Sequence, residues 1–289
     1  MTAYTEMEVR AALRRVWPDA RTVETPEIRA LGGGSEPRTF VAVAGSLRYV
    51  LRLPLASLPP LLDLATEARA MRAAAEAGLA PDVVAVDLDA GLLLTEYVAG
   101  SWTPELVRQP HVSATVVRAL RRLHRLDVDL PVYAVARIAA SYLAELDRGG
   151  ARAVSDEREW AEELARRGRH FDAAYPPTAF CHNDLAAANI VGDTVAARFI
   201  DFEYAGRGTP LLDLASFAGM NGFAENERQR LLDEYYGRTA APALRDLDSA
   251  IRMLWLLAYF WARVAEQRAP RAQAPAQLVT QIGAILRQS

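Results

Sequence analysis

The side chains that could do chemistry gather in the stretch from residue 180 to residue 213. An HxDxxxxN loop holds Asp184 and Asn189, and the short apolar strand that follows it ends in Asp201. Transfer of a phosphoryl group needs a carboxylate that accepts the proton of the acceptor, and oxygen ligands that hold magnesium against the triphosphate. We therefore predict that Asp184 is the base and that Asn189 and Asp201 are metal ligands.

The residues of the two motifs resemble those of one protein family in particular. Residues 182–189 read HNDLAAAN and residues 200–204 read IDFEY. This pair of motifs resembles the choline/ethanolamine kinase branch of the aminoglycoside phosphotransferase-like families, because Asn183 follows the histidine and Glu203 and Tyr204 stand where protein kinases carry a glycine after Asp-Phe. The resemblance implies a bilobed, protein-kinase-like α+β fold, with a small N-terminal lobe of antiparallel sheet plus helix and a large, mainly helical C-terminal lobe. It also implies ATP and Mg2+ as cofactors.

The composition fits a globular enzyme and argues against several other classes. The chain has 289 residues, 51% hydrophobic content, a formal net charge of -3 and no run of basic residues interleaved with aromatics, so nucleic acid is not an expected partner. Cys181 is the sole cysteine, which rules out a disulfide framework within the chain. The longest hydrophobic run, 253–261, is far below the roughly 20 residues of a membrane span, and no apolar leader opens the sequence. We predict a cytoplasmic protein without membrane insertion and leave its oligomeric state open.

Apolar periodicity divides the chain into a strand-rich first part and a helical second part. In the first part we expect a helix at 6–17, strands at 28–31, 39–43 and 48–53, a helix at 66–77 and strands at 81–86 and 92–97. In the second part we expect helices at 104–126, 138–146, 157–167, 212–218, 227–236, 244–265 and 276–286, with short strands at 190–191 and 198–200. The predicted domains are an N-terminal nucleotide-binding lobe (1–96), a hinge (97–100) and a C-terminal catalytic and acceptor-binding lobe (101–289).

A glycine triplet lies between the first two expected strands. Gly33 and Gly34, followed by Ser35, let the backbone approach phosphates closely and offer N–H groups to their oxygens. A glycine triplet alone is more often a flexible turn, but bacterial choline kinases show a similar loop one strand before YVLRLP-like residues, which here are residues 49–54. The chain departs from those kinases in having Ser35 and Glu36 where a Thr-Asn pair is usual.

Arg52 occupies the position at which protein kinases and aminoglycoside kinases carry the lysine of the third strand. All 33 basic residues of this chain are arginine, so the cation in this role must be a guanidinium. Its planar fork can bind phosphate oxygens in a bidentate manner, with Glu67 on the next helix as the expected ion-pair partner, whereas the alternative is a surface arginine on an edge strand. Glu96 and Val98 resemble the hinge residues whose backbone groups meet adenine.

Other residues of the motif are expected to support the base and the metal. By analogy with kinase catalytic loops, His182 is expected to be buried and structural near Asp201 rather than to act as an acid or base. Asp213 resembles the helix-start aspartate that braces the catalytic loop. Glu203 is a candidate third metal ligand, either direct or through a water molecule.

The expected acceptor is a small, cationic amino alcohol. Choline kinases surround a quaternary ammonium with aromatic faces, and here Trp255 and Tyr259 lie four residues apart on one expected helix face, while Tyr204 follows the metal motif. The alternative, in which this aromatic stripe packs in the core, is equally open. Met220 stands where choline kinases have a glutamate, and Glu225 from the next turn is a candidate substitute for that carboxylate.

The pattern as a whole predicts an ATP- and magnesium-dependent kinase that phosphorylates the hydroxyl of choline, ethanolamine or a similar amino alcohol. Thiamine, an aminoglycoside or a sugar are the alternative acceptors, and aminoglycosides are less favoured because the helices after Asp213 carry only scattered acids. An alternative from another class is a pseudokinase that binds nucleotide and signals through a partner. The intact Asp184, Asn189 and Asp201 argue against that alternative.

Overall fold

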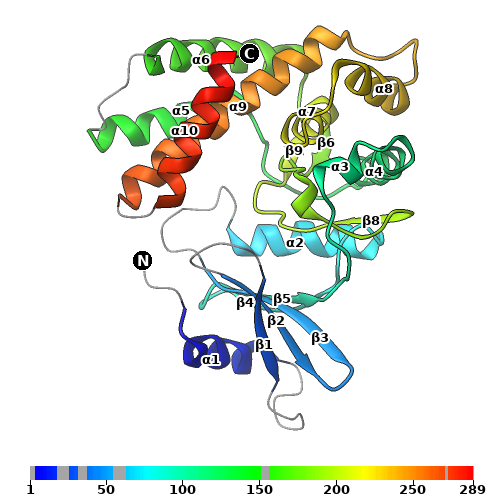
Figure 1. Cartoon of the computed structure of the whole chain (residues 1–289), viewed down its shortest axis with the longest axis vertical. Coiled ribbons are helices and arrows are strands. Elements are labelled where there is room, and N and C mark those ends of the chain that lie inside the picture. Colours follow the sequence, from blue (N-terminus) through cyan, green and yellow to red (C-terminus); the bar gives the residue numbers. More distant parts are fainter. Residues whose placement is uncertain are drawn as a thin grey trace. The chain divides into compact units, whose positions relative to one another are not determined.

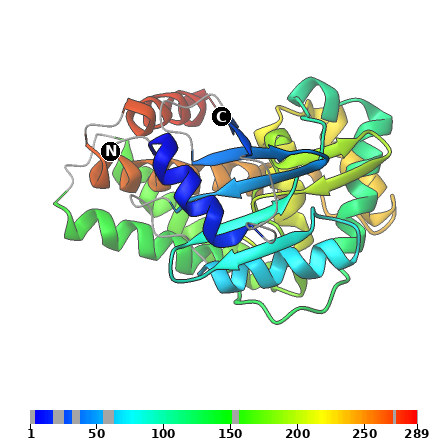
Figure 2. The ribbon, with the colours of Figure 1, turned by 90° about the horizontal axis from the view of Figure 1, so that it is seen from below.

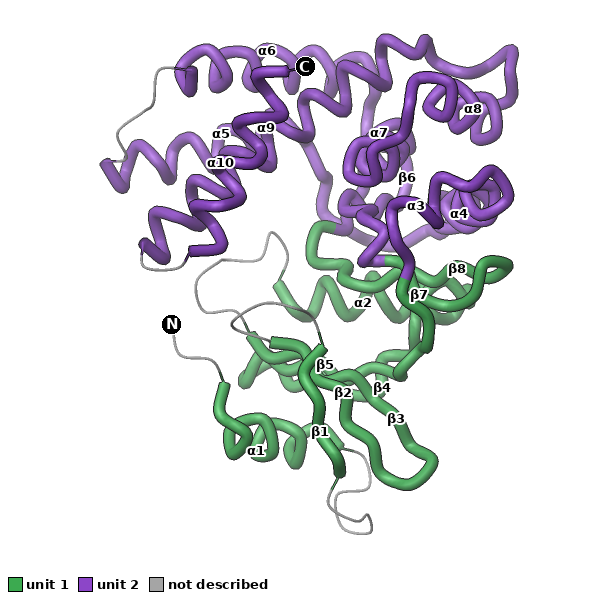
Figure 3. Tube along the Cα trace, viewed as in Figure 1, with its two compact units in different colours: residues 1–101, 190–204 green, residues 102–189, 205–289 purple. Residues whose placement is uncertain are grey.

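The chain divides into two compact units (Figure 3). The structure, a computed structural model, describes residues 4–17, 26–31, 38–54, 63–150, 156–270 and 273–288. Unit 1 comprises residues 1–101 and 190–204, and unit 2 comprises residues 102–189 and 205–289. Unit 1 therefore takes in a late segment, 190–204, that the lobe boundaries drawn from the sequence place in the C-terminal lobe.

Unit 1 is built on a five-stranded antiparallel sheet with the strand order β1-β2-β3-β5-β4 (Figure 1). The strands are β1 (Glu27–Leu31), β2 (Thr39–Ala44), β3 (Leu47–Arg52), β4 (Val83–Asp87) and β5 (Leu92–Glu96). The central strand is β3, in which Leu51 pairs with Phe40 of β2 and with Leu94 of β5. All three side chains are buried, so the middle of the sheet is anchored in the core of unit 1.

Two helices pack on this sheet, α1 (Glu6–Val16) and α2 (Leu64–Glu76). Helix α1 crosses the strands in Figure 2, and its Val9 and Leu13 join Leu51 in one apolar core. Because successive side chains of a strand point to opposite faces, Arg52 points away from this core. The other face of the sheet therefore carries the arginine, where α2 contacts it through Glu67.

The late segment of unit 1 is a hairpin of β7 (Ile190–Asp193) and β8 (Ala196–Phe199). It is tied to the earlier part of unit 1 by backbone hydrogen bonds from Gly192 N to Ala99 O at 3.1 Å and from Phe199 N to Leu79 O at 2.7 Å. These long-range bonds explain why the hairpin belongs to unit 1 in spite of its late position in the chain (Figure 3).

Unit 2 is mainly helical, with one small sheet of β6 (Ala179–Cys181) and β9 (Gly206–Gly208). Its helices are α3 (Pro104–Val107), α4 (Pro110–Leu123), α5 (Val135–Arg148), α6 (Glu157–Ala174), α7 (Pro210–Met220), α8 (Glu225–Tyr236), α9 (Leu244–Arg268) and α10 (Gln273–Gln288). Helix α7 is buried over its whole middle, from Leu211 to Ala218, as expected for a helix that is mostly apolar. Helix α9 packs against α5, α6, α7, α8 and α10, so α7 and α9 form the centre of this unit.

Most expected elements are present, and the differences have local causes. The helix expected at 104–126 is two helices, because Pro110 has no N–H to continue the first and instead opens the second at its favoured N-terminal position. Helix α6 continues beyond the expected end at Arg167 to Ala174. Strands β6 and β9 were not predicted, since three residues carry too little periodicity. No described helix is long and apolar enough to cross a membrane.

Candidate active site

Arg52 forms the cationic centre of unit 1. It is the last residue of β3, its Nη1 donates to Oδ1 of Asp201 at 2.9 Å, and its Nη2 donates to Oε2 of Glu67. Glu67 lies in the first turn of α2 and is 3% exposed. The predicted ion pair of Arg52 and Glu67 is confirmed, and the central place of β3 excludes the alternative of an arginine on an edge strand.

Burial and charge act in opposite directions on this ion pair. Burial raises the pKa of Glu67 above its usual value, and the neighbouring Arg52 offsets this effect only in part. Burial also disfavours the charge on Arg52, but Glu67, Asp201 and Glu203 outweigh it and raise the pKa of the guanidinium. Separating the pair would leave a buried charge without a partner, which is costly. The pair therefore holds the guanidinium in a fixed position at the end of β3.

The acidic motif follows β8. Asp201 has a φ of 64°, the left-handed region that residues other than glycine adopt rarely and that is often found at functional sites. Oε2 of Glu203 accepts a hydrogen bond from Nη2 of Arg38 at 3.0 Å and lies 3.7 Å from Nη1 of Arg52. The side chains of Asp201 and Glu203 are 29% and 20% exposed, so both carboxylates reach the surface of unit 1. Their hard oxygen atoms suit magnesium.

The other nucleotide-binding residues predicted for this unit are only partly visible. Gly33, Gly34 and Ser35 lie outside the described residues. Glu96 ends β5, and its Oε2 is 3.3 Å from Nη1 of Arg198 on β8, so this carboxylate has a partner in the hairpin. Val98 is half-buried in the segment after β5. The roles of Glu96 and Val98 towards a nucleotide stay predictions.

In unit 2, the HxDxxxxN loop follows β6, and side chains of α7 hold it along its backbone. The N–H groups of His182 and Asn183 donate to Oδ2 and Oδ1 of Asp213 at 2.9 and 2.6 Å. One helical turn later, Oγ of Ser216 accepts from the N–H of Leu185 at 2.8 Å. The predicted bracing role of Asp213 is confirmed, and Ser216 extends it.

Asn221, the C-cap residue of α7, completes the support of the loop. Its Oδ1 accepts from the N–H of Ala187 at 2.8 Å, and its Nδ2 donates to the carbonyl oxygens of Leu185 at 2.9 Å and Phe217 at 2.7 Å. Asn221 is 2% exposed. Buried backbone groups must be paired, and here the side chains of one helix pair them along most of the loop, which sets its geometry.

The loop itself brings Asp184 and Asn189 together. Nδ2 of Asn189 donates to Oδ2 of Asp184 at 2.8 Å and to its carbonyl oxygen at 2.9 Å. The amide nitrogen is a donor, so Oδ1 is the atom of Asn189 that can act as a metal ligand. His182 is fully buried, as predicted, and its Nδ1 accepts from the N–H of Asp184 at 3.3 Å. Asp184 is half-buried, and the hydrogen bond from Asn189 orients its carboxylate.

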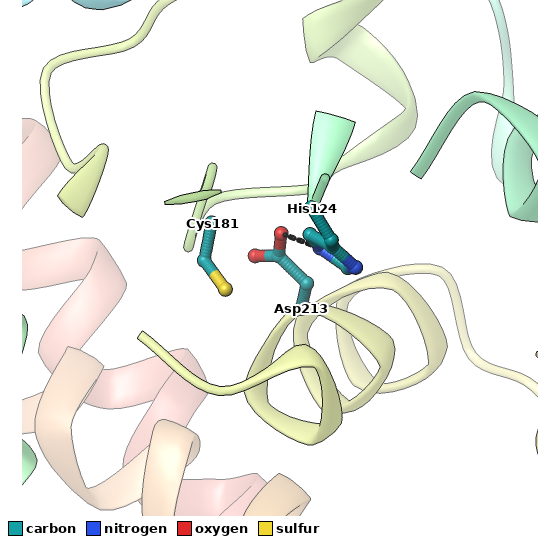
Figure 4. A group of neighbouring side chains, drawn as sticks. All are labelled: His124, Cys181 and Asp213. Carbon is teal, nitrogen blue, oxygen red and sulfur yellow. Dashed lines mark hydrogen bonds and ion pairs between the residues drawn. The ribbon is translucent and has the colours of Figure 1, made fainter. Parts of the chain in front are cut away.

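A buried cluster behind the loop consists of His124, Cys181 and Asp213 (Figure 4). Their potential ligand atoms lie within 4.8 Å of one another. Nε2 of His124 is 2.9 Å from Oδ2 of Asp213, and Nδ1 is 2.7 Å from the hydroxyl of Tyr235. Burial raises the pKa of the Cys181 thiol well above its usual value, so it remains protonated. These contacts describe a hydrogen-bonded support for Asp213, and a buried thiol with a raised pKa is not activated as a nucleophile.

One residue predicted to line the acceptor site belongs to the core. Tyr259 is 2% exposed, its hydroxyl donates to Oε1 of Glu157 at 2.8 Å, and its ring centroid is 4.9 Å from that of Trp160. Of the two alternatives that the sequence leaves open for the aromatic stripe, core packing therefore holds for Tyr259. The reason is that α9 is covered on this side by α6 and α10, which leaves no open face for a ligand.

The other predicted acceptor residues are at least partly accessible. Trp255 is half-buried and lines a small cavity between α7 and α9 together with Met220. The described residues around that cavity include no carboxylate. Glu225 is exposed as the first residue of α8, and Tyr204 is half-buried in unit 1. Trp255 and Tyr259, predicted to act together, thus have different surroundings.

Several supporting residues were not predicted from the sequence. Each has a polar side chain that contacts the motif, or a residue bound to it, from a distant part of the chain: Arg38, His124, Ser216, Asn221 and Tyr235. A signal existed for two of them, since Ser216 and Asn221 follow Asp213 on a helix that is otherwise apolar. Polar side chains within an apolar helix are expected to have hydrogen-bond partners.

This architecture, with a five-stranded sheet unit, a helical unit and a braced HxDxxxxN loop, is that of a protein-kinase-like phosphotransferase. A model of the phosphotransferase enzyme family matches residues 27–250, so the chain belongs to this family. Protein LicA of Haemophilus influenzae is 26% identical over 250 residues, which span 82% of this chain and 73% of the relative. The predicted superfamily is confirmed.

Solved structures agree with the fold. The crystal structure of choline kinase LicA from Streptococcus pneumoniae superposes with a TM-score of 0.80 at 14% identity, covering 99% of this chain and 100% of the other. A choline/ethanolamine kinase family protein from Mesorhizobium loti gives a TM-score of 0.76 at 27% identity, covering 97% and 94% of the two chains. The predicted protein-kinase-like α+β fold is confirmed.

Proposed function

We propose that this phosphotransferase is an ATP- and Mg2+-dependent kinase that transfers the γ-phosphoryl group to the hydroxyl of a small amino alcohol, with choline and ethanolamine as the leading acceptors. The observation that carries the proposal is the contact of Asp184 with Asn189 in a loop whose backbone is braced by α7. The similarity to choline and ethanolamine kinase structures supports the choice of acceptor.

Asp184 is the proposed base. The bond between the γ-phosphorus and the oxygen that bridges it to the β-phosphate breaks, the acceptor oxygen bonds to the phosphorus, and the hydroxyl proton passes to Asp184. Since the transition state of such transfers is loose, orienting the acceptor oxygen is at least as important as removing its proton. Two groups are suited to keep the carboxylate in one orientation, namely Nδ2 of Asn189 and the fixed backbone of the loop.

The proposed ligands of the metal ion are Asn189, Asp201 and Glu203. Their donor atoms are an amide oxygen and two carboxylates, which are the hard ligands that Mg2+ prefers, and the bound ion would neutralise charge on the phosphates. Ile190 pairs with Phe199 in the β7–β8 hairpin, whose first strand follows Asn189 in the chain and whose second strand leads to Asp201. Arg52 is the proposed phosphate-binding cation, held by Glu67.

For the acceptor, we propose that Trp255 and Tyr204 supply aromatic surface, because both remain partly accessible. Tyr259 is not part of this proposal, since it lies in the core. Glu225 is an exposed carboxylate that could attract a cation. A cationic amino alcohol carries the positive charge that aromatic faces and a carboxylate attract.

A panel of acceptors tests the reaction and its substrate class together. ADP release is measured with choline, ethanolamine, thiamine, an aminoglycoside and a simple sugar, each with ATP and Mg2+ at fixed concentrations. The largest kcat/KM is expected for choline or ethanolamine. Transfer to one of the other three alone would replace the proposed acceptor, and ATP binding without transfer to any of the five would favour a nucleotide-binding pseudokinase.

The role of Asp184 has a separate test. Asp184→Ala is expected to lower kcat by about 100-fold to 10,000-fold, the range for loss of a general base, with the dissociation constant for ADP nearly unchanged. Asp147→Ala, at an exposed aspartate of α5 in the same unit, is the matched control and should behave like the parent chain. Activity retained by Asp184→Ala would remove Asp184 from the role of base.

A further inference from the structure

Arg38 contacts the carboxylates proposed to bind the metal. It directly precedes β2, and Nη2 lies 3.0 Å from Oε2 of Glu203 and 3.9 Å from Oδ2 of Asp201. The side chain is 25% exposed. Its backbone is fixed, because the carbonyl oxygen of Arg38 accepts from the N–H of Leu53 at 2.8 Å. The sheet thus fixes the backbone of Arg38, and the guanidinium at the end of the side chain lies beside the two carboxylates.

The carboxylates that pair with Arg38 are less buried than Glu67, which pairs with Arg52. This difference gives the two arginines separate roles. Arg52 is bound to the buried Glu67 as well as to Asp201, so its position is determined by α2. Among the described residues, Arg38 forms ion pairs with Glu203 and Asp201, which are both partly exposed. A partly exposed pair is held weakly and exchanges readily for a better partner.

Resting on the metal ligands proposed above, we propose that Arg38 is an internal counter-ion which competes with the divalent metal for Glu203 and Asp201, and which exchanges to the nucleotide phosphates when these arrive. A metal ion at about 2.1 Å from a carboxylate oxygen would use the same lone pairs as the guanidinium and would repel it. Phosphate oxygens offer Arg38 a stronger, bidentate partner.

The consequence is that metal and nucleotide bind cooperatively. Without nucleotide, the metal must displace Arg38 from Glu203. With nucleotide, the phosphates draw Arg38 away and leave Glu203 free to act as a ligand. Each ligand therefore favours the state that binds the other, which is a positive coupling between two sites.

The test measures metal binding directly, with Mn2+ as a paramagnetic substitute for Mg2+ whose free form is counted by electron paramagnetic resonance. In the absence of nucleotide, Arg38→Ala is expected to bind Mn2+ about 5-fold to 10-fold more tightly than the parent chain, within the usual range of coupling factors. Arg38→Gln, which keeps the length of the side chain, should show the same direction and serves if the alanine variant does not fold. Arg48→Ala, at an exposed arginine of β3, is the matched control and should leave Mn2+ affinity unchanged.

Two further measurements separate the possible failures. Metal-free ADP should bind Arg38→Ala several-fold more weakly than the parent chain, because the exchanged guanidinium is missing. Equal or weaker Mn2+ binding by both Arg38 variants without nucleotide would overturn the counter-ion role even if the kinase assignment holds. Asp201→Asn should lose Mn2+ affinity in every case, and its failure to do so would overturn the proposed metal ligands and with them this inference.

Discussion

At the scale of single residues, the cations of the candidate site are guanidinium groups of arginine. The chain contains 33 basic residues and all are arginine, so the cation at the end of β3 cannot be the lysine that kinases usually carry there. Arg52 uses its fork to reach Asp201 with one nitrogen and Glu67 with the other. A lysine ammonium is a point charge and can satisfy only part of this arrangement.

The variant Arg52→Lys tests whether both nitrogens of the guanidinium are needed and whether residue 52 lies beside bound ATP. Losing one of two charge-assisted contacts, about 1.4 kcal/mol, should raise KM for ATP by about tenfold. A lysine-reactive acyl phosphate of ATP should label residue 52 in this variant, as measured by peptide mass spectrometry. The parent chain offers no lysine, and Arg48→Lys on the same strand is the control that should remain unlabelled at residue 48. Labelling of residue 48 but not of residue 52 would contradict the assignment.

At the scale of elements, the β7–β8 hairpin is fastened to the segment after β5 by a close backbone approach. Gly100 has a φ of 100°, and a Cβ built there would lie 2.3 Å from the carbonyl oxygen of Gly192. Ser101 and Val191 form an antiparallel bridge at the same place. The absence of a side chain at Gly100 therefore allows the hairpin that leads into the acidic motif to pack where it does.

The variant Gly100→Ala should lose both the allowed backbone conformation and this contact. Left-handed backbone alone costs about 1–2 kcal/mol, and the clash with backbone should bring the loss in unfolding free energy to about 3 kcal/mol or more. Gly45→Ala is the matched control, because Gly45 has a φ of 58° but no atom within 4 Å of its Cβ position. Urea denaturation of both variants separates strain from clash, and equal losses would show that the contact with Gly192 is unimportant.

At the scale of the whole molecule, resistance to acid depends on carboxylates whose pKa is lowered by folding. Glu163 on α6 accepts from Nε and Nη2 of Arg252 on α9 at 2.7 and 2.8 Å, and from Nε of Arg167 at 2.6 Å. The bonds from Arg252 are the main cause that lowers the pKa of Glu163 to about 2. A carboxylate with a lowered pKa stabilises the folded state above its unfolded pKa, and this stability is lost as the pH falls through the folded value.

The variant Glu163→Gln should accordingly be less stable at neutral pH than the parent chain, by about 1–2 kcal/mol after allowance for solvent screening. The difference should be constant from pH 7 to about pH 5 and should shrink steadily as the pH is lowered from about 4.5 towards about 2. Urea midpoints at a series of pH values measure it. Glu159→Gln, at an exposed acid on the same helix, is the control. A difference that stays constant down to pH 3 would contradict the shifted pKa.

The sequence by itself determined the reaction class and most of the elements. Asp184, Asn189 and Asp201 are recognisable because phosphoryl transfer requires these residue types within one short stretch of chain. Helix and strand positions follow from local apolar periodicity, whereas short elements such as β6, the break at Pro110 and the far end of α6 were missed. The pairing of Arg52 with Glu67 was also predictable from the resemblance.

The tertiary structure alone decided which side chains meet across long distances in the chain. It placed Tyr259 in the core by covering that face of α9, and it brought His124 to Asp213 and Arg38 to Glu203, which are 89 and 165 positions apart. The physical reason is that periodicity shows which face of an element is apolar, but not which other element covers it. The residues that give the motif its chemistry therefore lie in one short segment of the sequence. The residues that hold this segment in place, and its counter-ions, depend on how the elements pack.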